Sequence, residues 1–123
     1  MDAPRFLTFM SGPRDGETIE IDWQAEASGV LLGRLATCTV CLPDDPEVSR
    51  NHARLSTSKS GCTLEDLDSA NGTFVGEFRT EERVKGKQTI QPGQIFRVGR
   101  TRFQLDSAMS DSARALAFAA AAR

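Results

Sequence analysis

Short hydrophobic segments alternate with turn residues along the whole chain. The segments that turn residues bound predict β-strands over residues 6–10, 17–21, 30–33, 52–57, 62–66, 74–75, 88–90, 95–98 and 102–105. Within several of them every second residue is apolar, as at Phe103 and Leu105, while Arg102 and Gln104 fall on the opposite face. This period of two is typical of half-buried antiparallel strands. Because no helical pattern separates the segments, we predict an all-β antiparallel sandwich.

The composition changes after Asp106, where the chain becomes rich in alanine. Alanine is the best helix former, but Leu116 and Phe118 are the only large apolar residues there, so a helix would present a weak hydrophobic stripe. We therefore predict one β-sandwich domain over residues 1–106 and a C-terminal helix or linker over residues 107–123.

Charge and composition exclude several classes of function. The 123 residues carry 15 Lys and Arg against 17 Asp and Glu, and no stretch is basic enough for a nucleic-acid binder. No apolar run approaches the roughly 20 residues that cross a bilayer, so we expect no membrane association. The first ten residues lack the pattern of a secretory signal, and three cysteines suit a reducing compartment, which together favour the cytoplasm.

Polar residues cluster where the predicted strands end. These clusters are Gly33-Arg34, Ser49-Arg50-Asn51-His52, and the run from Leu64 to Val75. Loops at one end of a sandwich converge, so their residues can line one surface. That surface would offer Arg34, Ser49, Arg50 and Asn71. Guanidinium groups donate paired hydrogen bonds to phosphate oxygens, a hydroxyl adds a donor, and an amide can pair with a peptide backbone, so the set suits a phosphorylated peptide.

The order of these motifs resembles the forkhead-associated (FHA) domain over residues 5–106. The motifs are G-R, then S-R-x-H, then L-x-D-L-x-S-x-N-G-T, and a closing P-G-Q-I-F-R-V-G. Ordered motifs are far more specific than any one of them alone. The resemblance implies a sandwich of about eleven short strands, of the FHA/SMAD-like type, whose apical loops bind phosphothreonine.

The resemblance also implies a role for each matching residue. Arg34 and Ser49 would hold the phosphate, Arg50 would assist, and Asn71 would bind the ligand backbone just after the phosphothreonine. Four further residues would shape the site: Gly33, His52, Gly72 and Thr73. Many family members have Ser or Thr where this chain has Ala70, so a ligand contact there would come from the backbone.

The implied function is a phosphothreonine-dependent protein–protein interaction module in Ser/Thr kinase signalling, with no catalysis and no cofactor. Its partner would be a phosphothreonine-containing protein, either a kinase or a kinase substrate. One alternative is a structural or oligomerising sandwich with a vestigial phosphate site. A second alternative is a hydrolase using Ser49 and His52. Two observations disfavour it: the sequence has no G-x-S-x-G motif, and the strand position of His52 is typical of a structural imidazole.

The three cysteines raise the question of a metal site. Cys38 and Cys41, with Cys62 and His52, begin like a zinc motif, but an extended strand would point Cys38 and Cys41 to opposite faces. We therefore expect no metal and interpret the thiols as small buried hydrophobic groups.

An acidic loop leads directly into the predicted phosphate site. Asp44, Asp45 and Glu47 would border a dianionic ligand with only Arg34 and Arg50 to offset them. The hypothesis that follows is a ligand with Lys, Arg or apolar residues, and not Asp or Glu, shortly after the phosphothreonine. The alternative is a solvated turn whose carboxylates face away from the ligand.

Overall fold

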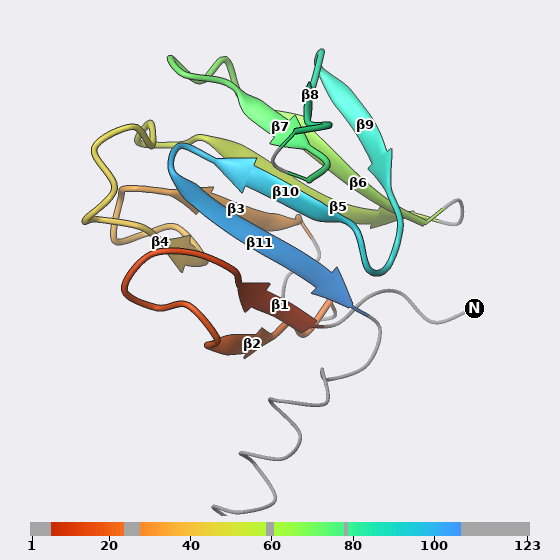
Figure 1. Ribbon diagram of the computed structural model, residues 1–123, viewed down its shortest axis with the longest axis horizontal. Coiled ribbons are helices and arrows are strands. Elements are labelled where there is room, and N and C mark those ends of the chain that lie inside the picture. The colour runs from red at the N-terminus through yellow and green to blue at the C-terminus, as the bar shows by residue number, and fades with distance from the viewer. Residues whose placement is uncertain (1–5, 24–27, 59–60, 78, 107–123) are drawn as a thin grey trace, which may run out of the picture.

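Two β-sheets pack face to face in the computed structural model (Figure 1). The structure describes residues 6–23, 28–58, 61–77 and 79–106, which contain eleven strands and no helix. The strands are β1 (Phe6–Phe9), β2 (Thr18–Glu20), β3 (Val30–Gly33), β4 (Val40–Cys41), β5 (Ala53–Ser58), β6 (Gly61–Asp66), β7 (Thr73–Val75), β8 (Glu82–Arg83), β9 (Lys87–Ile90), β10 (Ile95–Val98) and β11 (Thr101–Asp106). The predicted C-terminal helix or linker lies outside the described residues.

The predicted sandwich is confirmed, and the expected segments match their strands to within one residue at each end. The pattern did not predict β4 and β8, because strands of two residues are too short to show an alternation. The expectation of antiparallel pairing is wrong for β3 and β4, which pair in parallel with Leu32 opposite Val40. Their connection, residues 34–39, returns the chain along the sheet edge before β4 begins.

The core lies between the six-stranded sheet β2-β1-β11-β10-β7-β8 and the five-stranded sheet β4-β3-β5-β6-β9. Alternate residues of each strand point inward, as the sequence pattern predicts; Leu55, Phe96 and Phe103 are completely buried. The Phe103 ring stacks on Phe96 with centroids 5.2 Å apart and meets Phe9 at 4.8 Å. All three rings belong to the six-stranded sheet, where they form an aromatic layer on its buried face, and the loops carry the polar groups.

Antiparallel pairing brings four connections to one end of the sandwich, at the left of Figure 1. Residues 34–52, which include the short strand β4, join β3 to β5; residues 67–72 join β6 to β7, and residues 99–100 join β10 to β11. The β1–β2 turn, residues 10–17, reaches the same end because β1 pairs with β11. We call these four connections the loop end.

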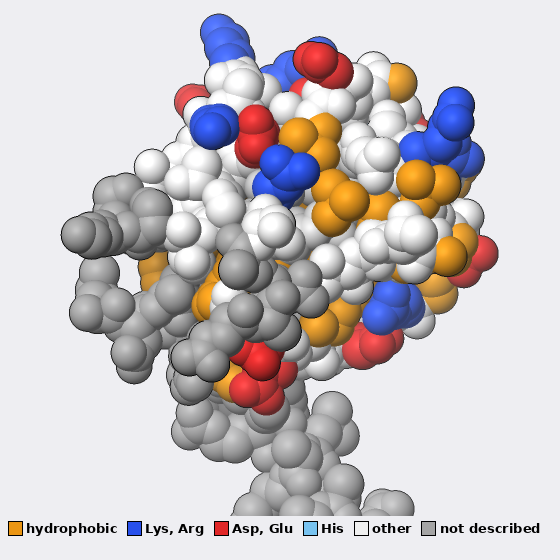
Figure 2. Space-filling model, turned by 180° about the vertical axis from the view of Figure 1, so that it is seen from behind, with side chains coloured by type: hydrophobic (Ala, Val, Ile, Leu, Met, Phe, Trp, Pro, Cys, Tyr) orange, Lys and Arg blue, Asp and Glu red, His pale blue; other side chains and the backbone are white. Residues whose placement is uncertain are grey.

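The outer face seen from behind in Figure 2 has no large area of one charge. Seen from behind, where the five-stranded sheet lies, hydrophobic side chains are interspersed with basic and acidic ones (Figure 2). The described residues include no helix with the length and hydropathy needed to cross a membrane.

Candidate functional site

Backbone hydrogen bonds bring Arg34 and Ser49 together at the loop end. The Arg34 N–H donates to the Ser49 carbonyl (3.1 Å), and the Leu35 N–H donates to the Arg50 carbonyl (3.4 Å). Gly33 permits this approach, because a Cβ at its position would collide with the Arg50 carbonyl oxygen. The side chains of Arg34 and Arg50 are exposed and bind no other side chain among the described residues. Both guanidinium groups are therefore open to an anionic ligand.

His52 joins two of the loops from the interior. The ring is completely buried; its Nδ1 accepts the Ser49 N–H (2.9 Å), and its Nε2 lies 2.8 Å from the Gly72 carbonyl oxygen. Only the neutral ring protonated at Nε2 satisfies both contacts, because a backbone N–H donates and a carbonyl accepts. Burial lowers the pKa of His52, which keeps the ring neutral near pH 7.

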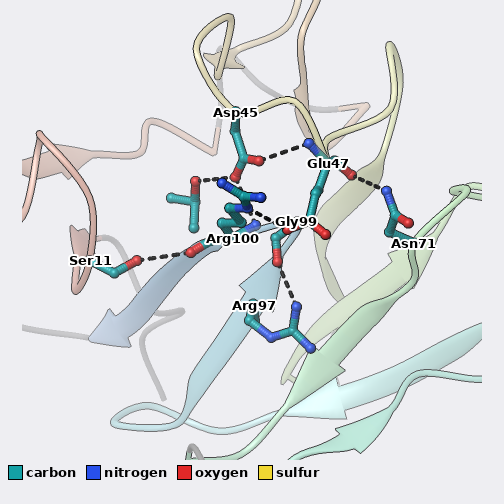
Figure 3. A network of polar contacts seen from close by, with 8 residues as sticks. Ser11, Asp45, Glu47, Asn71, Arg97, Gly99 and Arg100 are labelled. Carbon is teal, nitrogen blue, oxygen red and sulfur yellow. Dashed lines mark hydrogen bonds and ion pairs between the residues drawn. The ribbon is translucent and has the colours of Figure 1, made fainter.

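The β6–β7 loop, residues 67–72, contacts Ser49 and its neighbours directly. The Ala70 N–H donates to Ser49 Oγ (3.0 Å), and Asn71 Nδ2 donates to the Glu47 carbonyl (2.9 Å; Figure 3). No acceptor for the Ser49 hydroxyl hydrogen and no donor to Asn71 Oδ1 are found among the described residues. The surface thus combines two free guanidinium groups with one hydroxyl donor and one amide acceptor.

The carboxylate of Asp66, the last residue of β6, holds the β6–β7 loop in place. Asp66 Oδ1 accepts the hydroxyls of Ser69 (2.5 Å) and Thr73 (2.7 Å), and Ser69 Oγ accepts the Gly72 N–H (3.0 Å). The turn between them includes Asp68 in the left-handed region, at φ 56°. The Asp66 cluster therefore fixes the backbone that presents Ala70 and Asn71, and it explains the buried position of Thr73.

The acidic loop is arranged differently from the sequence-based hypothesis. Asp45 points inward and is only 8% exposed: it accepts the Arg100 N–H (2.8 Å), the Thr101 hydroxyl (2.8 Å) and the Glu47 N–H (3.0 Å; Figure 3). The Glu47 carboxylate pairs with Arg100 Nε at 2.8 Å. The expectation that Arg34 and Arg50 alone offset these carboxylates is therefore wrong, because it did not include the cation from the β10–β11 turn.

Asp44 is the part of the acidic loop that remains exposed without a polar partner among the described residues. The specificity hypothesis for Asp44, Asp45 and Glu47 therefore depends mainly on Asp44, since the other two carboxylates have structural partners.

The thiols of Cys38 and Cys41 contact the backbone of the two surface arginines. Cys38 Sγ lies 3.3 Å from the Arg50 carbonyl oxygen, and Cys41 Sγ lies 3.6 Å from the Arg34 carbonyl oxygen. Burial raises the pKa of Cys38, and it raises that of Cys62 to about 11. No group of three or more His, Cys, Asp or Glu side chains placed to hold a metal ion is found in the described part of the chain.

Comparison with known proteins identifies the family. The family model for the FHA domain matches residues 30–99, which contain the four surface residues Arg34, Ser49, Arg50 and Asn71. The chain belongs to the FHA domain family. Its sandwich and its loop end are therefore those of an FHA domain.

Relatives and solved structures agree with this assignment. FhaB, an FHA domain-containing protein of Mycobacterium tuberculosis (strain CDC 1551 / Oshkosh), is 34% identical over 103 residues, which are 84% of this chain and 61% of that protein. Thus the chain spans less than two thirds of the length of this relative. Mycobacterium tuberculosis EmbR, solved in complex with a low-affinity phosphopeptide, has a TM-score of 0.69 at 23% identity over 89% of this chain and 26% of its own.

A further solved chain comes from a structural and functional analysis of phosphothreonine-dependent FHA domain interactions. It has a TM-score of 0.67 at 24% identity and covers 88% of this chain and 100% of its own. At these identities the two solved structures show the FHA fold.

The structure brings together the predicted surface residues and adds residues that sequence reasoning missed. Asp66, Ser69 and Arg100 support the loops of this FHA domain, but only the first two stand in a recognisable motif. Arg100 follows the last glycine of the closing motif, and nothing in its local sequence indicates that it pairs with a loop 53 residues earlier in the chain.

Proposed function

We propose that this FHA domain binds a phosphothreonine-containing segment of a partner protein on the surface formed by Arg34, Ser49, Arg50 and Asn71. The observation that carries the proposal is the convergence of free arginines and a free hydroxyl donor at one end of the sandwich, where the Arg34 backbone bonds to Ser49 and His52 anchors Ser49 to the β6–β7 loop. The phosphopeptide complex of EmbR and the phosphothreonine-dependent interactions studied for the related fold support it.

Each surface group has one role in this proposal. Arg34 donates two hydrogen bonds to phosphate oxygens, and Ser49 donates its hydroxyl while its Oγ stays fixed by the Ala70 N–H. Arg50 adds a second positive charge beside the dianion. Asn71 Oδ1 accepts a ligand backbone N–H, while Asn71 Nδ2 keeps the Glu47 carbonyl in place.

FHA domains are interaction modules rather than enzymes, and we propose that this one catalyses no reaction. A hydrolase would need Ser49 Oγ to face a basic ring nitrogen. Here His52 Nδ1 receives the Ser49 backbone N–H and Nε2 contacts Gly72, so both nitrogens are used for loop contacts. The proposed partner is a phosphoprotein of Ser/Thr kinase signalling in the cytoplasm, either a kinase or a kinase substrate.

The test is calorimetry or fluorescence anisotropy with a phosphothreonine peptide library and its unphosphorylated counterpart. Phosphothreonine peptides should bind, and peptides with Thr or Asp at that position should not, because one carboxylate lacks the charge and the three acceptor oxygens of a phosphate. Arg34→Ala should cost about 2 to 5 kcal/mol of binding free energy, a loss of thirtyfold or more.

Arg79→Ala is the matched control, since Arg79 is exposed in the β7–β8 connection at the opposite end of β7. Its affinity should equal that of the wild-type domain. Absence of binding to every library peptide would instead favour the alternative of a structural or oligomerising sandwich.

A further inference from the structure

The β6–β7 loop contains a pair of residues that is chemically unstable. Asn71 is followed by Gly72, whereas the other asparagine of the chain, Asn51, is followed by His52. An asparagine before glycine readily loses its side-chain ammonia, because glycine has no Cβ to hinder the approach of its backbone nitrogen to the amide carbon. The proposed ligand surface therefore includes the Asn-Gly pair of this sequence, its most deamidation-prone asparagine.

Deamidation of this pair needs no enzyme and no reactant other than water. The Gly72 nitrogen gives its proton to a solvent base and attacks Asn71 Cγ. The N–Cγ bond forms, the Cγ–Nδ2 bond breaks, and ammonia leaves with a proton taken from water. Water then opens the five-membered imide at either of its two carbonyl carbons, which leaves aspartate or isoaspartate at position 71. The rate thus depends on how freely the Gly72 N–H and the Asn71 side chain can meet.

The structure restrains the attacking nitrogen. The Gly72 N–H donates to Ser69 Oγ (3.0 Å); Gly72 is buried, and Ser69 is only 7% exposed. Ser69 Oγ in turn donates to Asp66 Oδ1 (2.5 Å). Loss of the Gly72 proton would therefore break a buried hydrogen bond and place a negative nitrogen close to a carboxylate.

The structure also restrains the carbon that would be attacked. Asn71 Nδ2 donates to the Glu47 carbonyl (2.9 Å; Figure 3), which fixes the orientation of the side-chain amide. The Gly72 carbonyl oxygen lies 2.8 Å from His52 Nε2, so Gly72 is held at its N–H and at its carbonyl. Ring closure must therefore break contacts of both residues before the two reacting atoms can approach each other.

We propose that Asn71-Gly72 is a site of spontaneous deamidation, that Ser69 slows this reaction in the folded domain, and that the reaction weakens phosphopeptide binding. Aspartate at position 71 would present an oxygen to the Glu47 carbonyl in place of an amide donor, and it would add a negative charge beside the phosphate. Isoaspartate would add a methylene group to the backbone and displace Gly72 from Ser69. The effect on binding rests on the proposed phosphothreonine site, whereas the protection by Ser69 does not.

The test incubates the folded domain at neutral pH and follows the loss of the Asn71 amide by mass spectrometry of a proteolytic fragment. Ser69→Ala removes the acceptor of the Gly72 N–H. This variant should deamidate about five- to tenfold faster than the wild-type domain, the factor that corresponds to one hydrogen bond.

Thr73→Val is the matched control. The Thr73 hydroxyl is also buried and donates to the same Asp66 oxygen (2.7 Å), but it is not the acceptor of the Gly72 N–H. Its deamidation rate should equal that of the wild-type domain. If Ser69→Ala does not fold, as judged by circular dichroism, the wild-type domain unfolded in urea replaces it. The folded domain should then react at least about tenfold more slowly than the unfolded chain, and equal rates would overturn the protection.

Binding is measured with a phosphothreonine peptide after chromatography has separated the intact and deamidated forms of the wild-type domain. The deamidated forms should bind at least about tenfold more weakly. A Ser69→Ala rate equal to that of the wild-type domain, or an equal acceleration in Thr73→Val, would overturn the role of Ser69.

The two measurements keep this inference separate from the proposed function. Full affinity of the deamidated forms would overturn the effect on binding and leave phosphothreonine binding in place. If the intact domain binds no phosphopeptide, the proposed function fails together with the effect on binding, and the deamidation rates still decide whether Ser69 protects Asn71.

Discussion

Buried polar side chains determine how the exposed ones at the loop end are presented. Asp45 and His52 are both buried, and each accepts hydrogen bonds from backbone groups of the loop that carries Ser49. Neither would touch the proposed ligand. Since a buried polar group without a partner is costly, both residues hold the loop in one arrangement.

Replacing Asp45 with asparagine should destabilise the domain. The Asp45 carboxylate accepts three hydrogen bonds, from the Arg100 N–H, the Thr101 hydroxyl and the Glu47 N–H. An asparagine amide nitrogen is a donor, so at least one backbone N–H would face another donor. We expect Asp45→Asn to lower the free energy of unfolding by about 1 to 3 kcal/mol, measured by urea denaturation.

Asp44→Asn is the control for this substitution, because the neighbouring Asp44 is exposed and has no hydrogen bond or ion pair to another described residue. Its stability should stay within about 0.5 kcal/mol of the wild-type value. Equal stability of the two variants would contradict the inward position of Asp45.

At the scale of elements, the β10–β11 turn supports the loop before Ser49 from the side opposite Asn71. Gly99 makes this packing close: its φ is +60°, and a Cβ there would lie 2.6 Å from Val48 Cγ2 and 3.0 Å from Asp45 Oδ2. The site therefore depends on a turn that contributes no residue to the proposed phosphate contacts.

Gly99→Ala should accordingly weaken both stability and phosphopeptide affinity. The added methyl group must displace Val48 and Asp45, and with them the backbone leading to Ser49, in addition to the strain of a positive φ. We expect a loss of stability about 1 to 3 kcal/mol larger than in Gly93→Ala, together with weaker binding in calorimetry.

Gly93→Ala provides the comparison because Gly93, at the other end of β10, also has a positive φ (+90°), yet a Cβ there would meet no atom within 4 Å. This variant isolates backbone strain, so its phosphopeptide affinity should equal that of the wild-type domain. Equal losses of stability in the two alanine variants would show that crowding against Val48 and Asp45 has no effect.

The strands could be predicted from the sequence because their side chains alternate between core and solvent. Leu55, Leu64, Phe96 and Phe103 occupy the inward positions that the alternation indicates, and all four are completely buried. The two-residue strands β4 and β8 could not be predicted, because their pairing depends on the neighbouring strand and on no local pattern.

At the scale of the whole molecule, contacts between segments distant in the sequence determine which charged groups pair, and local motifs do not show these partners. The motifs placed Arg34, Ser49 and Asn71 in the correct loops, since strand ends converge in a sandwich. They did not reveal that Glu47 pairs with Arg100, because that contact depends on how the β10–β11 turn packs. Sequence thus predicted which loops carry the candidate site, and packing determined the partners of its charges.

One titration should link this packing to the stability of the whole domain. His52 is the only histidine, and burial lowers its pKa below the ordinary value of 6.5. The hydrogen bond to Gly72 and the charges of Asp66 and Asp45 act in the opposite direction but are smaller. Below pH 6.5 the unfolded chain therefore binds a proton that the folded domain does not, and the unfolded state is favoured.

The free energy of unfolding should consequently be constant just above pH 7 and fall as the pH is lowered from 6.5 toward the pKa of folded His52, by at most about 1.4 kcal/mol per pH unit. Urea denaturation at pH 7.5, 6.5 and 5.5 measures this slope. His52→Gln, which keeps an amide donor for the Gly72 carbonyl but does not titrate, should be less stable at pH 7.5 and should show a smaller slope between pH 6.5 and 5.5. A wild-type slope no larger than that of His52→Gln would mean that the buried ring accepts a proton as readily as it does in the unfolded chain. That result would contradict a neutral His52 ring that links the Ser49 N–H to the Gly72 carbonyl.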